Sequence, residues 1–199
     1  MMYTDEDGEF AVRTARKVVE SYLERKTMPK IDFPEKFNRK GGVFTTISTY
    51  PDHNLRGCIG YPEPIMKLSE ALIKSALAAA FEDPRFPPLR KDEIENVVFE
   101  VSLLTPPEEI KVKKRKDLLN EVVVGKHGLI AERGFYRGLL LPQVPVEWNW
   151  DVQEFLEQTC WKAGLPMDCW LDENTKIYRF TAEIFEEEKP GGRIRRKKL

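Results

Sequence analysis

The residues best suited to chemistry lie in the run Leu55-Arg56-Gly57-Cys58-Ile59-Gly60. Glycines on both sides of a cysteine allow positive φ and close backbone approach, so the thiol can be presented on a turn. A neighbouring guanidinium lowers the pKa of a thiol or holds an anion. The run therefore predicts a functional turn with Cys58 as the candidate reactive group and Arg56 as the anion anchor. The other residues expected to contact a ligand there are Gly57, Ile59 and Gly60.

A reactive cysteine needs a base and a group that stabilises an oxyanion. The chain has two histidines, His53 and His127, and their spacing places neither beside Cys58. The structural alternative is that Cys58 is a small apolar filler, because free cysteine is among the most buried residue types. Both interpretations stay open, so the residues do not decide whether the protein is an enzyme.

Composition excludes several classes of protein. The 199 residues are 41% apolar, which suffices for one sizeable core or two small lobes. Charged residues make up 33% of the chain but the net charge is only −1, which predicts a dense, balanced surface of the thermophile type rather than a polyanion binder. The acidic N-terminus and the lack of a long apolar run predict a soluble, cytoplasmic protein without a membrane segment.

The three cysteines argue against a secreted disulfide framework, because one of them must stay unpaired. Whether Cys160 and Cys169 pair is left open by the sequence. No cysteine or histidine has the spacing of a metal site, so no metal and no cofactor is expected.

Hydrophobic periodicity predicts interspersed helices and strands. The expected helices cover residues 9–26, 64–82, a short stretch near 118–119, and 152–163. The expected strands cover residues 42–48, 97–104, 122–124, 129–132, 135–141 and 177–185. Short spacings between the later strands favour antiparallel pairing, so the class is α+β, a mainly antiparallel sheet flanked by helices. A proline-rich loop is expected at 83–89, and the basic tail 191–199 is expected to be disordered.

Two G-x-x-G runs, at 57–60 and 125–128, have the spacing that KH domains use to clamp RNA. The second lies between short β-like runs, which favours a hairpin turn. Basic clusters at 111–116 and 193–198 are short and lack alternating aromatics, so nucleic-acid binding is disfavoured and survives only as a third, weak hypothesis.

The stretch Glu147-Trp148-Asn149-Trp150-Asp151 combines two indoles with two carboxylates. Asp151 is expected to cap the following helix, with Glu154 completing the cap. Glu147 has no such structural role, so it is a candidate acid, base or ligand contact. Trp161 and Trp170 are expected to pack in the core.

The hexapeptide at 55–60 resembles the signature of the AMMECR family. Further matching motifs follow in the family's order, over roughly residues 10 to 185: Arg85-Phe86-Pro87-Pro88, Val101-Ser102-Leu103-Leu104-Thr105, His127-Gly128, Leu141-Pro142 with Val144, and Trp150-Asp151. The resemblance implies one domain over residues 1–190, built of two unequal, packed lobes with a cleft between them near the hexapeptide. It also makes His127 the preferred partner of Cys58 and adds Arg85 to the ligand contacts.

The family's biochemical function is unsettled, and the resemblance implies a modification pathway shared with Memo-type and radical-SAM-type proteins. Our leading hypothesis is a protein that binds a small or peptide-like substrate in this cleft. The alternative is a noncatalytic protein-interaction module with an inert thiol. This chain lacks the three-cysteine pattern of a radical-SAM cluster, so it would be a partner or a separate step in such a pathway.

Overall fold

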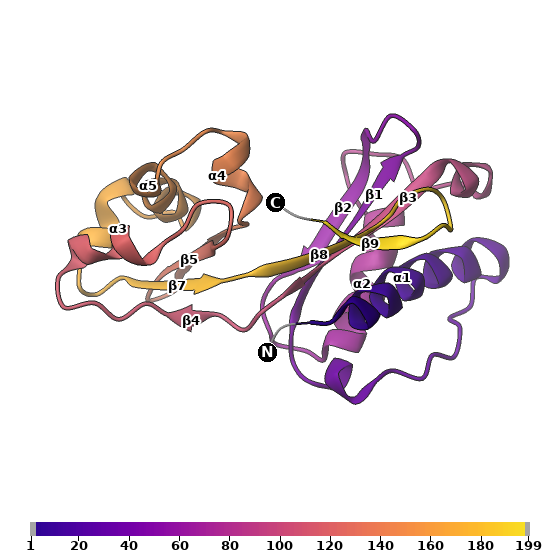
Figure 1. The fold of residues 1–199 in the computed structure, drawn as a ribbon, viewed down its shortest axis with the longest axis horizontal. Coiled ribbons are helices and arrows are strands. Elements are labelled where there is room, and N and C mark those ends of the chain that lie inside the picture. The colour runs from indigo at the N-terminus through magenta and orange to yellow at the C-terminus, as the bar shows by residue number, and fades with distance from the viewer. Residues whose placement is uncertain (1–2, 198–199) are drawn as a thin grey trace. The chain divides into compact units, whose positions relative to one another are not determined.

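The computed structural model describes residues 3–197 of the chain, which fold into two compact units. Of the described residues, unit 1 comprises 3–105 and 183–197, and unit 2 comprises Pro106–Ala182. Each unit has its own sheet with antiparallel strand pairs and its own helices, which confirms the α+β class (Figure 1). The cleft implied by the family resemblance stays a prediction.

The sheet of unit 1 positions the hexapeptide. Its strand order is β2-β1-β3-β8-β9, which puts β2 at one edge. The strands are β1 (Gly42–Thr49), β2 (Leu55–Tyr61), β3 (Val97–Leu104), β8 (Ala182–Glu187) and β9 (Ile194–Lys197). Strand β1 pairs antiparallel with both β2 and β3. The strands expected at 42–48 and 97–104 are confirmed, but the expected turn at 55–60 is strand β2.

Helices α1 (Asp5–Arg25) and α2 (Leu68–Phe81) pack on one face of this sheet (Figure 1). Helix α1 begins earlier than expected because the Thr4 hydroxyl accepts from the Asp7 amide and the Asp7 carboxylate accepts from the Thr4 amide. Helix α2 begins later than expected, after a turn that follows Pro64. The buried core between helices and sheet includes Val12, Val19, Leu72, Ala76, Val43, Ile47, Phe99 and Val101.

The sheet of unit 2 has the order β4-β7-β5-β6. Its strands are β4 (Glu108–Glu109), β5 (Gly128–Arg133), β6 (Tyr136–Leu140) and β7 (Lys176–Phe180), and its helices are α3 (Leu118–Glu121), α4 (Gln143–Glu147) and α5 (Val152–Lys162). Asp151 caps α5 as expected. A disulfide joins Cys160 of α5 to Cys169, which settles the pairing that the sequence left open.

Two expectations about unit 2 are wrong. Residues 122–124 form no strand, because Val122 packs in the core and the amides of Lys126 and His127 both donate to the Val123 carbonyl in a turn. This turn leads from α3 to β5, so it is not the expected hairpin. Trp161 is 66% exposed, whereas Trp170 is buried as expected.

The C-terminal part of the chain also differs from expectation. The strand expected at 177–185 is divided at Thr181 into β7 and β8, which belong to different sheets. The tail expected to be disordered forms β9 over Ile194–Lys197, where Arg196 bonds the Asp5 carboxylate, the Glu183 carboxylate and the Tyr3 carbonyl. Residues 198 and 199 of that expected tail lie outside the described residues. Within residues 3–197, none of the helices has the length and apolarity to cross a membrane.

Candidate functional site

Cys58 lies on the face of the unit 1 sheet that turns away from the helical core. Thr46 of β1 pairs with Cys58 of β2 on one side of the strand and with Glu100 of β3 on the other side. Because directly paired residues share a face, these three side chains form a row. The neighbours of Thr46 along β1 point the other way, and Thr45 and Ile47 are fully buried. The half-buried Cys58 is therefore on the sheet face opposite the helices.

The two glycines that flank Cys58 and Ile59 are required by close packing. A Cβ atom at Gly57 would lie 2.0 Å from the carbonyl oxygen of Ala79 in α2. A Cβ atom at Gly60 would lie 2.1 Å from the Phe44 ring. Neither glycine has positive φ. The predicted close backbone approach at these glycines is confirmed, but residues 55–60 form a strand and not the predicted turn.

The backbone of Cys58 is held by an aspartate–arginine pair at the sheet edge. Its amide donates to Asp83 Oδ2 at 2.8 Å, and its carbonyl accepts from Arg85 Nη2 at 3.2 Å. The Arg85 guanidinium also donates to both Asp83 carboxylate oxygens, at 2.9 and 2.7 Å. These hydrogen bonds hold the pKa of the Asp83 carboxyl well below its usual range, with the Arg85 side chain as the largest cause.

The two members of this pair differ in exposure. The Asp83 side chain is 2% exposed, whereas the Arg85 side chain is 53% exposed. Asp83 therefore anchors β2 to the loop that follows α2, and Arg85 presents a cation to solvent beside Cys58. Arg85 was assigned to the ligand contacts from the family resemblance, and the structure brings it to Cys58.

The Cys58 thiol accepts a hydrogen bond from Thr46 Oγ1 at 3.2 Å. Burial raises the pKa of this thiol, and the nearby carboxylates Glu100 and Asp83 raise it further. The Thr46 hydrogen bond and the charge of Arg85 act in the opposite direction, but the net shift is upward. The thiol is therefore protonated at neutral pH, and a proton must be removed before it can act as a nucleophile.

Arg56, the expected anion anchor, is already paired. Its Nε and Nη2 donate to the two oxygens of Glu93 at 2.9 and 3.1 Å, and its side chain is 11% exposed. A bidentate pair of this kind neutralises the guanidinium. Arg85 is paired with Asp83 in the same bidentate way, but its side chain is 53% exposed against 11% for Arg56, so an anion can reach Arg85 more readily.

The candidate residues His127 and Glu147 belong to unit 2, whereas the contacts of Cys58 described above are all within unit 1. His127 is 8% exposed, and its Nδ1 accepts from the Val123 amide. Burial lowers the pKa of His127, with further lowering by Arg179 and Lys126. Its pairing with Cys58 stays a prediction. His53 lies in the turn between β1 and β2, where its ring meets Tyr50 edge-on.

Three side chains of this site were missed by sequence reasoning: Thr46, Asp83 and Glu93. Thr46 was taken only as a strand residue, and its register opposite Cys58 is set by the long-range pairing of β1 with β2. Asp83 was predicted only to begin the proline-rich loop at 83–89, with no role at the site. The spacing Asp83-x-Arg85 before a proline-rich loop was the available signal, because it suits a local ion pair that projects from a turn.

These features define an α+β protein of two units in which an edge strand with closely packed glycines carries a half-buried cysteine. The chain belongs to the AMMECR1 family, whose pattern it matches over residues 12–185.

Relatives of similar length match the chain throughout. Protein MJ0810 of Methanocaldococcus jannaschii is 58% identical over 198 residues, covering 100% of this chain and 98% of that protein. Protein PH0010 of Pyrococcus horikoshii is 56% identical over 200 residues. The crystal structure of the latter, described as an uncharacterized protein, superposes with a TM-score of 0.85 and covers 98% of each chain. These thermophile relatives agree with the balanced, highly charged composition.

Proposed function

We propose that this protein binds a small or peptide-like ligand at the edge strand β2, around Cys58 and Arg85. Arg85 contacts an anionic group of the ligand, and the protonated thiol of Cys58 serves as a neutral contact. The observation that supports this proposal is the pair at the sheet edge, where a buried carboxylate holds a half-exposed guanidinium beside Cys58.

The enzyme hypothesis requires a thiolate, and burial, the largest influence on the pKa of Cys58, acts against one. The hydroxyl of Thr46 donates to the thiol and cannot take up its proton at neutral pH. Binding without thiolate chemistry therefore fits the site better than covalent catalysis does. It also fits the noncatalytic interaction module, for which the Memo-type and radical-SAM-type proteins implied by the family resemblance are the proposed partners.

The role of Arg85 is testable with two alkylating reagents that differ in charge. Cys160 and Cys169 are joined in a disulfide, so Cys58 is the free thiol to be alkylated. At fixed pH, the rate ratio of anionic iodoacetate to neutral iodoacetamide is measured and divided by the same ratio for N-acetylcysteine. In water, one charge about 6 Å away contributes roughly 0.7 kcal/mol, so loss of the Arg85 charge should lower the normalised ratio about threefold.

Variants separate Arg85 from the paired charges around it. The normalised ratio is expected to fall about threefold in Arg85→Gln, which leaves the Asp83 carboxylate unbalanced, and much less in Asp83→Asn/Arg85→Gln, which removes the two opposite charges together. The matched variant Arg56→Gln/Glu93→Gln removes the neighbouring, less exposed pair and should keep the wild-type ratio. A ratio that depends on Arg56 instead would contradict the assignment of Arg85 as the anion contact.

A further inference from the structure

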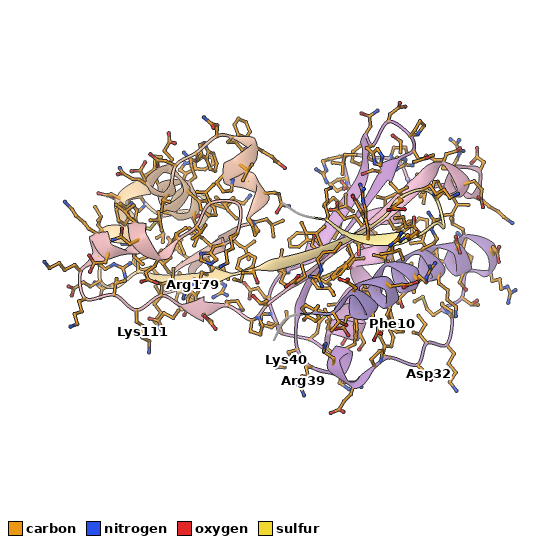
Figure 2. All side chains as sticks on the ribbon, in the orientation of Figure 1. Phe10, Asp32, Arg39, Lys40, Lys111 and Arg179 are labelled. Atoms are coloured by element: carbon orange, nitrogen blue, oxygen red, sulfur yellow. A yellow bond between two sulfur atoms is a disulfide. The ribbon has the colours of Figure 1, made fainter. Side chains whose placement is uncertain are left out.

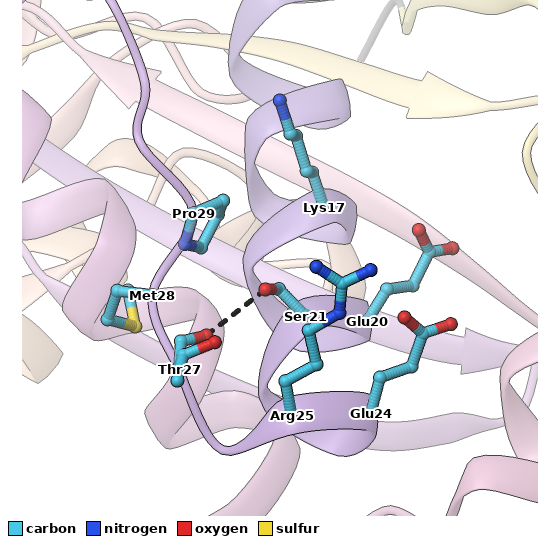
Figure 3. Close-up of a pocket in the computed structure, with 8 residues that line it drawn as sticks. All are labelled: Lys17, Glu20, Ser21, Glu24, Arg25, Thr27, Met28 and Pro29. Carbon is cyan, nitrogen blue, oxygen red and sulfur yellow. Dashed lines mark hydrogen bonds between the residues drawn. The ribbon is translucent and has the colours of Figure 1, made fainter.

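Unit 1 has a hollow surface formed by α1 and the segment 27–32 that follows it. Two cavities line up along the helix, one of about 420 Å³ and one of about 340 Å³, and Lys17 lines both. Figure 3 shows the smaller cavity, with Met28 and Pro29 across from the helix. We call the two cavities together the α1 furrow. Volumes of this size are those of small-molecule sites.

The wider cavity carries excess positive charge. Three cations line it, Arg13, Lys17 and Lys30, together with one carboxylate, Asp32. Arg13 is paired with Glu9 on the same helix. Lys17 and Lys30 are exposed, and neither forms an ion pair within residues 3–197. Two ammonium groups without carboxylate partners therefore border one cavity, where an anion would neutralise them.

The same cavity has an apolar wall. Phe10 contributes its ring, which packs edge-on against Phe33 and Phe37 at centroid distances of 5.6 and 5.1 Å. Ile31 adds aliphatic surface from the opposite segment. Figure 2 shows Phe10 on α1 and Asp32 on the segment that faces it. Because its ring is fixed by two aromatic neighbours, Phe10 offers a rigid surface for a planar group.

We infer that the wider cavity of the α1 furrow binds a phosphomonoester attached to a planar aromatic group. Lys17 and Lys30 contact the phosphate, and Phe10 and Ile31 contact the planar group. This site is separate from the one at Cys58. Helix α1 packs on the core face of the sheet through Val12 and Val19, whereas Cys58 is on the opposite face. The inference therefore stands or falls independently of the proposed function.

Adenosine monophosphate is the probe, with adenosine and inorganic phosphate as its two halves. Calorimetric titration of the full chain is expected to show AMP binding at least tenfold tighter than either half. In Lys17→Gln/Lys30→Gln, the dissociation constant for AMP should rise about tenfold, because two exposed charges are lost. The matched variant Lys91→Gln/Lys162→Gln removes two exposed lysines outside the furrow and should bind AMP like the wild type.

Amide chemical shifts locate the site. On addition of AMP, the largest changes are expected at Thr14, Lys17 and Ile31, and they should be absent in the Lys17/Lys30 double variant. The inference is overturned if millimolar AMP produces no heat and no shift changes. It is equally overturned if adenosine or phosphate binds as tightly as AMP, or if the furrow and control variants weaken binding alike.

Discussion

Replacing Arg16 by alanine is expected to lower the free energy of unfolding of unit 1 by about 3–5 kcal/mol. Arg16 is 8% exposed on α1, and its Nε and Nη2 each donate at 2.6 Å to Glu187 of β8, which is 2% exposed. The guanidinium also donates to the carbonyls of Ile94 and Val97. Without it, the Glu187 carboxylate is left buried without its cation. Urea denaturation followed by far-ultraviolet circular dichroism measures the loss.

Arg13 supplies a matched control on the same helix. It pairs with Glu9, four residues away, but both side chains are about half exposed, at 52% and 53%. Exposed pairs contribute little, so Arg13→Ala should cost no more than about 1 kcal/mol. Equal losses for the two arginine variants would show that burial does not set the contribution of the Arg16–Glu187 pair.

Gly57→Ala should destabilise unit 1 by about 3 kcal/mol, because the added methyl group would meet backbone rather than a side chain. The nearest atom is the Ala79 carbonyl oxygen, at 2.0 Å, so either β2 or α2 must move. Gly60→Ala meets the Phe44 ring instead. Phe44 is only half-buried and its ring can rotate, so the loss there should be about 1 kcal/mol.

Chemical denaturation of the two glycine variants ranks these losses, and Cys58 adds a local measurement. If β2 is displaced from α2 in Gly57→Ala, the Cys58 thiol becomes more accessible and its alkylation accelerates, while Gly60→Ala keeps a rate closer to the wild type. A Gly57→Ala protein as stable as the wild type would contradict the close approach of β2 and α2.

Much of the fold could be predicted from local sequence pattern. The β-branched run at 42–48 and the apolar run at 97–104 are strands, and the periodic stretch at 9–26 is a helix. The change of sheet at Thr181 could not be predicted. Residues on both sides of it suit a strand, and only long-range pairing assigns β7 and β8 to different sheets. Strand β9 was missed because its charges resemble a solvated tail, yet Arg196 and Lys197 form ion pairs across the sheet.

The site was predictable in part. The hexapeptide marked Cys58, and the family resemblance added Arg85. The sequence did not show that Arg56 is paired with Glu93, because 37 residues separate them. Nor did it show the direction of the thiol pKa shift. Arg56, two residues before Cys58, suggested a lowered thiol pKa. In the structure the nearby cation is Arg85, and burial, together with the carboxylates of Glu100 and Asp83, outweighs its effect.

We propose that Cys58 contacts the ligand as a protonated thiol at neutral pH. The pH dependence of Cys58 alkylation by iodoacetamide tests this protonation state directly. The rate is followed in the native, unreduced protein, where Cys58 is the free cysteine. An ordinary thiol has a pKa of about 8.5. Because burial opposes the thiolate, we predict that the pH midpoint of the alkylation rate lies above that value. A midpoint well below that value would reveal a stabilised thiolate. It would contradict the proposed role of Cys58 as a neutral contact and favour nucleophilic or redox chemistry there.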